Sequence, residues 1–292
     1  MYVVKLGGFL LSIFVMYSND RVEPFIQMQE FLNEMTLYKD CQKTLIVDGK
    51  LAQTYENWDA IEVPRVNGKF CWGRMWDAGV LSSRNESILY LDSDRLLPKN
   101  YLIKVVDKIK DDVFLFTSNH FLMHKVVSTD LCREFIENDD CFGTSKFNGT
   151  VQYDPRFKDP VHGPSKNVMS GSTAFTKKTY LRLGGVDHWY CGHGAYADTD
   201  FHYKASLGGC KFVDLKLTEL HYMHSKSDNG NVVPYEKLKL MSLDNFIYYC
   251  TKWSLPLVLA ENVAMKAVIK NPKKHVAQRA KILKNSPRNR FE

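Results

Sequence analysis

Apolar and polar residues follow one another along most of the chain in the order expected for strands that alternate with helices. Continuous apolar runs predict buried strands over residues 10–19, 43–49 and 87–94. Apolar residues at helical spacing predict helices over residues 23–39, 70–84 and 98–110. Further strands are expected within residues 59–65 and, as an adjacent pair, within 112–128. This order predicts an α/β fold, Rossmann-like, with a mostly parallel sheet flanked by helices.

The first apolar run could have another meaning, because residues 2–20 also resemble the core of a signal peptide. Lys5 interrupts this run, and the unbroken part is too short to span a bilayer comfortably. We therefore expect a buried first strand and keep a targeting segment as the alternative. Residues 1–235 are expected to form the catalytic domain, and residues 236–292 a C-terminal helical extension with a basic tail.

Charge and cysteine content narrow the function classes. The net charge of +6 is concentrated from Lys266 onward, which predicts either a solvated helix with a frayed tail or a surface for anionic lipid. No zinc-finger spacing or RNA-binding aromatic motif accompanies this charge, so no nucleic-acid partner is expected. The seven cysteines include no CxxC pair, so reduced thiols are expected rather than a zinc site.

Polar side chains stand where the predicted strands end, and this is where parallel sheets bind ligands. They are Asn19, Asp48, Asp92 and Asp94. Asp92 and Asp94, separated only by Ser93, could hold one hard cation that bridges phosphate oxygens. No glycine-rich phosphate loop is present, so metal and basic side chains would have to neutralise a diphosphate. A turn or helix cap is the alternative role for these acids.

A second cluster lies within residues 169–204. A helix is expected over residues 177–185, and an aromatic, glycine-rich loop leads from it to Asp198 and Asp200, which open another helix. These acids either complement the helix dipole or include a general base below an aromatic acceptor platform. His221 and His224 follow an apolar strand and are expected to contact the metal.

These segments together resemble metal-dependent glycosyltransferases of the GT-A fold, most closely the β-1,4-galactosyltransferases and related inverting enzymes. The resemblance covers residues 10–235 approximately. Four stretches carry it, in the family's order and at similar spacing: "FCWGRMWDAGV", "LYLDSDRLLP", "GSTAFTKKTYLRLGGVDHWYCGHGAYADTD" and "HYMHSKSD".

The resemblance implies a role for each matching residue. Asp94 would bind Mn²⁺ or Mg²⁺ directly, together with His224 and, in the place of a family methionine, His221. Asp92, with Ser93, would contact ribose or metal-bound water. Asp198 would be the catalytic base that inverts the anomeric carbon. The remaining donor contacts would be Asn19, Asp48 at the nucleobase and Arg74 at the diphosphate. The acceptor contacts would be Gly171, Trp189, Tyr190, His193, Tyr196 and Asp200.

The chain also departs from the family at positions that select substrates. Ala197 replaces the glutamate that helps to hold the acceptor, His193 replaces a tryptophan, and Trp72 replaces an arginine. The expected donor is therefore a UDP-sugar of unspecified sugar, and the expected acceptor is a glycan or glycoprotein. A cytoplasmic or peripheral-membrane protein of microbial or viral origin is expected, with a secretory location as the alternative. Competing functions are a retaining transferase, a sugar-binding module without catalysis, and a nucleotidyltransferase.

Overall fold

The structure is a computed structural model, and it describes residues 10–123, 128–137, 151–153, 171–192, 196–222, 227–228, 231–232, 234–257 and 269–285. The strands are β1 Ser12–Tyr17, β2 Gln42–Asp48, β3 Asp59–Val63, β4 Ser87–Asp92, β5 Arg95–Leu96, β6 Val113–Phe116, β7 Asn119–Met123, β8 Val151–Tyr153, β9 Ser172–Thr176, β10 Lys211–Asp214, β11 Thr218–Tyr222, β12 Ser227–Asp228 and β13 Asn231–Val232. The helices are α1 Val22–Asn33, α2 Trp72–Ser82, α3 Tyr101–Lys108, α4 Thr129–Glu137, α5 Lys177–Arg182, α6 Ala197–Leu207, α7 Tyr235–Lys252 and α9 Pro272–Lys284, and Tyr38–Asp40 forms a 3₁₀ turn.

Seven strands form the central sheet, in the order β10-β6-β9-β4-β1-β2-β3. β1 pairs in parallel with both β2 and β4, whereas β9 runs antiparallel to both β4 and β6. The predicted α/β architecture with a mostly parallel sheet is therefore confirmed. The strands expected within 112–128 do form, but consecutive β6 and β7 belong to different sheets. β7 lies in a second sheet with the order β5-β11-β7-β8.

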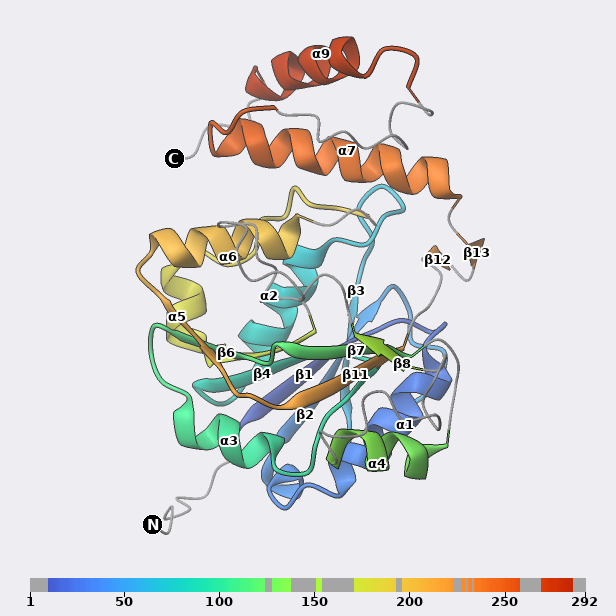
Figure 1. The fold of residues 1–292 in the computed structure, drawn as a ribbon, viewed down its shortest axis with the longest axis vertical. Coiled ribbons are helices and arrows are strands. Elements are labelled where there is room, and N and C mark those ends of the chain that lie inside the picture. The colour runs from blue at the N-terminus through green and yellow to red at the C-terminus, as the bar shows by residue number, and fades with distance from the viewer. Residues whose placement is uncertain are drawn as a thin grey trace.

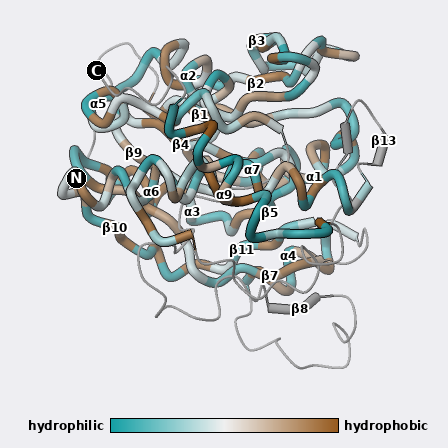
Figure 2. Tube along the Cα trace, turned by 90° about the horizontal axis from the view of Figure 1, so that it is seen from above, coloured by the Kyte–Doolittle hydropathy of each residue, from teal (hydrophilic) through white to brown (hydrophobic). Residues whose placement is uncertain are grey.

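Helices cover the central sheet on both faces, as Figure 1 shows. α1, α3 and α4 lie on one face, α2, α5 and α6 lie on the other, and α7 and α9 lie beyond that second group. In the view of Figure 2, hydrophobic and hydrophilic positions alternate along the surface helices, which is typical of helices with one buried side.

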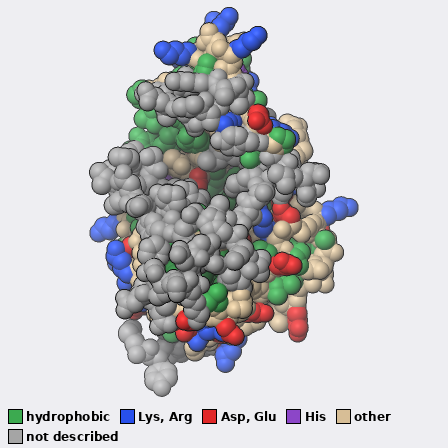
Figure 3. Space-filling model, turned by 45° about the vertical axis from the view of Figure 1, so that its right-hand side comes forward, with side chains coloured by type: hydrophobic (Ala, Val, Ile, Leu, Met, Phe, Trp, Pro, Cys, Tyr) green, Lys and Arg blue, Asp and Glu red, His purple; other side chains and the backbone are tan. Residues whose placement is uncertain are grey.

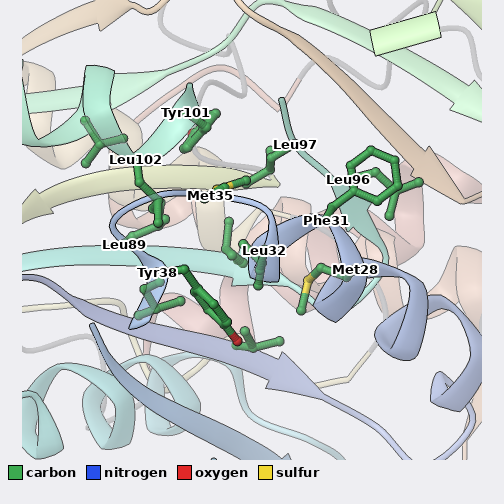
Figure 4. Packing of buried hydrophobic residues seen from close by; sticks show 14 of the residues in the cluster. Met28, Phe31, Leu32, Met35, Tyr38, Leu89, Leu96, Leu97, Tyr101 and Leu102 are labelled. Atoms are coloured by element: carbon green, nitrogen blue, oxygen red, sulfur yellow. The ribbon is translucent and has the colours of Figure 1, made fainter. Parts of the chain in front are cut away.

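The two faces of the sheet bury two separate hydrophobic cores. All of β1 is buried, and its residues alternate between the cores as the period of a strand requires: Ile13 and Val15 face one, Phe14 and Met16 the other. Figure 4 shows the first core, where α1 and α3 pack against β4. In the second core α2 approaches β1 so closely that a Cβ atom on Gly79 would lie 2.5 Å from the ring of Phe14.

The C-terminal helices share the second core. Leu243, Ile247 and Tyr248 of α7 are buried in the same cluster as residues of the sheet, and Val276 of α9 joins them. α9 also carries lysine and arginine side chains, visible at the top of Figure 3. Within the part of the chain that the structure describes, no helix is both long and apolar enough to cross a membrane.

Candidate active site

The paired acids lie at the carboxyl end of β4, in the middle of the sheet. Asp92 is the last residue of β4 and is in register with Met16 of β1. Ser93 and Asp94 are both 4% exposed, so the turn after the strand is largely covered. The Tyr90 hydroxyl donates a hydrogen bond to Asp92, and burial raises the pKa of Asp92 while Arg95 opposes that rise. The sheet therefore holds two acids at the position where parallel sheets bind ligands.

His221 reaches the acids because a strand from late in the chain pairs with the residues that follow them. β5 begins directly after Asp94 and pairs antiparallel with β11, with His221 opposite Arg95. This register brings His221 Nε2 to 3.5 Å from Asp94 Oδ1. Carboxylate oxygen is a preferred ligand of Mn²⁺ and imidazole is a common ligand of transition-metal ions, so this pair is compatible with the expected cation.

The rest of the expected metal site lies outside the described residues, because His224 is not among them. Within the described ranges, no group of three or more His, Cys, Asp or Glu side chains is arranged to hold a metal ion. Asp92, Asp94 and His221 are thus the expected metal contacts that lie within the described residues.

A buried ionic network, centred on Arg95, contacts both Asp92 and Asp94. Arg95, which is 1% exposed, places Nη2 3.5 Å from Asp92 Oδ2 and Nε 3.9 Å from Asp94 Oδ1. On its other side Arg95 Nη1 donates to Glu219 Oε1 at 2.8 Å, and Glu219 also accepts from the Ser172 hydroxyl. The guanidinium is therefore shared between the two site acids and one interior acid, which fixes its position.

Arg21 is a further basic residue at the site that the sequence analysis did not select. It lies between β1 and α1, and its Nε is 3.8 Å from Asp94 Oδ2. The position could have been found, because Arg21 follows Asn19 by two residues at a strand's carboxyl end. Arg74, expected at the diphosphate, is exposed on the first turn of α2, near Cys71 and His188.

Asn19 and Asp48 lie at the carboxyl ends of adjacent strands, and both have partners within the protein. The Asn19 amide donates to the Lys50 carbonyl at 2.8 Å and accepts from the Ala52 amide at 3.0 Å. Asp48 accepts from Arg65 Nε at 3.0 Å and from a second nitrogen of the same guanidinium. Asp48, predicted to contact the nucleobase, is therefore an ion-paired carboxylate, and Arg65 would be next to any group that binds it.

Asp198 lies on the first turn of α6 and is half-buried. Burial raises the pKa of Tyr90, and the negative charges of Asp92 and Asp198 raise it further. The Tyr90 hydroxyl contacts the strand-end acid Asp92, and the charge of Asp198, 106 residues further along the sequence, also acts on it.

The residue that precedes α6 has a strained backbone. Tyr196 has a φ of 72°, in the left-handed region that residues with a side chain seldom adopt. Its ring lies 5.5 Å from that of Phe246 and 5.6 Å from that of Tyr249, both on α7. α7 therefore supports the loop that leads to Asp198.

Asp200 was expected to contact the acceptor, but the structure gives it an interior role. It is 0% exposed, and its carboxylate accepts from Lys252 Nζ at 2.7 Å, Trp253 Nε1 at 2.6 Å and the Tyr190 hydroxyl at 3.1 Å. Tyr190 is also 0% exposed. Neither side chain can reach an acceptor without breaking this network, so we remove both from the acceptor contacts.

The other expected acceptor contacts have different surroundings. Trp189 is half-buried and stacks on Tyr248 at a ring distance of 5.0 Å. Gly171 lies beside the acids instead: its carbonyl accepts from the Asp92 amide at 3.1 Å, and a Cβ atom there would lie 2.8 Å from the Arg95 guanidinium. With a φ of 108°, this position requires glycine. His193 lies outside the described residues.

Comparison with solved structures gives the class of fold. The chain aligns with GalNAc-T7 bound to UDP, GalNAc and Mn²⁺ at a TM-score of 0.54 and 11% identity, over 84% of this chain and 48% of that one. It aligns with residues 1–349 of S. aureus TarS in complex with UDP-GlcNAc at 0.52 and 12%, over 94% and 71%. The corresponding UDP complex of TarS gives 0.50 and 12%, over 97% and 93%. The chain thus spans about half the length of the GalNAc-T7 chain.

These likenesses, together with the sheet order and its single reversed inner strand, define the fold. The protein has the GT-A fold, and the neighbouring structures are GT-A glycosyltransferases. No family model matches the sequence, and no curated protein matches it either. The resemblance to β-1,4-galactosyltransferases in particular stays a prediction.

Proposed function

We propose that this protein is a metal-dependent, inverting glycosyltransferase that moves a sugar from a UDP-sugar to a hydroxyl group of a glycan or glycoprotein. The observation that carries the proposal is the position of Asp92, Asp94 and His221 at the carboxyl end of β4, where the charge of Asp198 also acts on the Tyr90 hydroxyl that hydrogen-bonds to Asp92. Neighbours of the same fold that were crystallised with UDP or a UDP-sugar support the donor class.

Asp94 and His221 would hold a Mn²⁺ or Mg²⁺ ion, with His224 and Asp92 as further contacts. When bound, such a cation supplies charge neutralisation for the leaving diphosphate. Arg21, next to Asp94, is placed to add positive charge on the phosphates. Asn19, the Asp48–Arg65 pair and Arg74 are proposed to contact the rest of the nucleotide.

Asp198 is proposed as the general base. It would accept the proton of the acceptor hydroxyl while that oxygen attacks the anomeric carbon from the face opposite the diphosphate, which inverts the configuration. Trp189 and Tyr196, supported by α7, are proposed to form the platform on which the acceptor sugar lies, together with His193. Ala197 leaves no carboxylate next to the base, so acceptor selection would differ from that of the galactosyltransferases.

A donor screen tests this proposal without knowledge of the acceptor. Purified protein would be incubated with Mn²⁺ and a panel of UDP-, GDP- and TDP-sugars, and release of nucleoside diphosphate would be followed. We expect slow hydrolysis of one UDP-sugar that stops on chelation and in Asp94→Asn, but continues in the exposed control Asp107→Asn. Turnover that survives chelation would contradict the metal role. Absence of any nucleotide binding by calorimetry would overturn the transferase proposal.

Product stereochemistry separates inversion from retention, the competing outcome on the same scaffold. Once the donor is known, the anomeric configuration of the transferred sugar can be read by proton NMR. A product with the donor's own configuration would exclude Asp198 as the base of a single displacement. Donor binding without transfer or hydrolysis would instead favour a sugar-binding module.

A further inference from the structure

Two cysteines outside the proposed catalytic groups face each other across a short backbone pairing. Cys71 directly precedes α2, Cys191 follows Tyr190, and the two residues form a single antiparallel bridge. The Gly192 amide donates to the Phe70 carbonyl at 2.7 Å, one position outside the pair. This is the pattern of a non-hydrogen-bonded pair, in which Cα atoms lie about 4.5 Å apart and side chains approach closely. Disulfides span Cα distances of about 4.4–6.8 Å.

The sulfur atoms of Cys71 and Cys191 share one hydrogen-bond acceptor, the carbonyl oxygen of His188. Cys71 Sγ is 3.2 Å and Cys191 Sγ is 3.3 Å from the carbonyl oxygen of His188. Both side chains therefore point to the same side of the bridge. The backbone bridge and the shared acceptor place the two thiols next to each other, as a disulfide would require, and both are reduced in this structure.

The electrostatic surroundings make Cys71 the more acidic thiol. A hydrogen bond from Cys191 lowers the pKa of Cys71 against the effect of burial, and the Arg74 amide and the charges of His188 and Arg74 lower it further. The same hydrogen bond and burial raise the pKa of Cys191. A thiolate beside a neutral thiol is the arrangement of an attacking and a resolving cysteine.

The thiols of the four other described cysteines have raised pKa values. Burial raises the pKa of Cys41 and of Cys132 to about 12, that of Cys250 to about 11, and that of Cys210 in the same direction. Among the cysteines that the structure describes, Cys71 alone has a lowered thiol pKa. Cys71 is buried and Cys191 is partly exposed, so a small oxidant would approach the pair from the Cys191 side.

We propose that Cys71 and Cys191 form a redox-active pair, which a peroxide converts to a disulfide. The Cys71 thiolate attacks one peroxide oxygen, the O–O bond breaks, and the leaving hydroxide takes up a proton to become water. Cys71 is then a sulfenic acid. Cys191 loses its proton and attacks the Cys71 sulfur, the S–O bond breaks, and a second water leaves. Two thiols are oxidised to one disulfide while one peroxide is reduced to two waters.

The bond would add a covalent link between two segments that lie 120 residues apart in the sequence and already pair through their backbones. It would tie the residue before α2 to Cys191, which precedes Asp198 by seven residues in the sequence. A cross-link that closes so long a loop restricts the unfolded chain strongly. Oxidation should therefore raise the unfolding temperature, on the order of 10 °C. This inference does not depend on the proposed transferase activity.

The test uses the full chain, reduced, then treated with increasing hydrogen peroxide and digested without reductant. We expect a cross-linked peptide that contains Cys71 and Cys191, lost again on dithiothreitol treatment together with the rise in unfolding temperature. In Cys191→Ser, Cys71 should stay a sulfenic acid that dimedone traps. The buried control Cys132→Ser should still form the cross-link.

The wild-type protein decides the outcome even if a variant fails to fold. Separate alkylation of Cys71 and Cys191 after peroxide treatment would overturn the proposal. A cross-link from either residue to a different cysteine would overturn it too. Because neither readout involves a nucleotide sugar, failure here and failure of the donor screen are distinguishable.

Discussion

Arg95 and Glu219 form an ion pair in the interior of the protein, with 2.8 Å between Nη1 and Oε1 and with side chains only 2% and 0% exposed. The same guanidinium faces Asp92 and Asp94. Removing one partner of a buried pair leaves an uncompensated charge, which costs about 3–5 kcal/mol. Glu219 is therefore a positioning residue for the strand-end acids as well as a stabilising one.

Glu219→Gln should lower the free energy of unfolding by about 3–5 kcal/mol and should also weaken Mn²⁺-dependent UDP binding. Urea denaturation and calorimetry measure the two effects. Breaking the exposed Lys178–Asp111 pair by Lys178→Met serves as control, with a much smaller expected cost, because exposed ion pairs contribute little to stability. If Glu219→Gln lost stability but bound UDP and Mn²⁺ as the wild type does, the positioning role would be wrong.

Asp94→Asn should weaken metal-dependent UDP binding by more than about 100-fold, beyond the 10–100-fold typical of residues that only orient a ligand. The reason is the loss of the carboxylate that lies 3.5 Å from His221. Calorimetry with and without Mn²⁺ provides the measurement, and Asp107→Asn is the matched control. Equal binding by both variants would exclude Asp94 as a ligand.

Asp198→Asn should leave donor affinity unchanged and lower kcat by roughly 10²–10⁴, the usual effect of losing a general base. Transfer assays on the donor found in the screen measure kcat, and calorimetry measures donor affinity. Asp200→Asn should behave differently, with its main effect on stability, because Asp200 is buried against Lys252 and Trp253. Full activity in Asp198→Asn would mean that another group accepts the proton.

Lys252→Met should lower the free energy of unfolding by about 3–5 kcal/mol, because it leaves Asp187 and Asp200 without their shared cation. Chemical denaturation measures this loss. The double variant Lys252→Met, Asp200→Asn should recover part of it, since one of the two stranded charges is then removed. A loss below about 1 kcal/mol would show that the pair behaves as a surface salt bridge does.

The pH dependence of stability offers a separate test of the same contact. Burial would raise the pKa of Asp187, but the charge of Lys252 and several hydrogen bonds hold it below its ordinary value. A carboxyl with a lowered folded pKa stabilises the protein above the unfolded pKa, about 3.9, and that contribution disappears as the pH falls through the folded pKa. The stability difference between wild type and Asp187→Asn should therefore be constant from pH 5 to 7 and shrink below about pH 4. A difference that grows on acidification would contradict this assignment.

Much of the fold could be predicted because its signals are local. The apolar runs around Val15, Leu45 and Leu89 gave buried strands at the expected places, since both faces of such strands are covered. The separation of β6 from β7 into two sheets could not be predicted, because it depends on pairing with β9 and β11, far along the chain.

The same distinction applies to the site. Asp92 and Asp94 could be predicted as site residues because they stand at the end of an apolar strand. Glu219 and Lys252 do not, because their partners are Arg95, 124 residues away, and Asp200, 52 residues away. Asp200 was predicted to be a site acid for the same reason. No residue near it in the sequence indicates that Lys252 forms a buried ion pair with it. The roles of the remaining site residues stay predictions.

The reversed strand β9 also constrains how the protein can be made. β9 lies between β4 and β6 in the sheet, yet Ser172–Thr176 is synthesised long after both of its neighbours. Until that segment has been synthesised, the edges of β4 and β6 that pair with β9 in the finished sheet have no partner. Such edges favour association between chains. We therefore expect nascent chains that have not reached β9 to depend on chaperones, whereas completed chains would not.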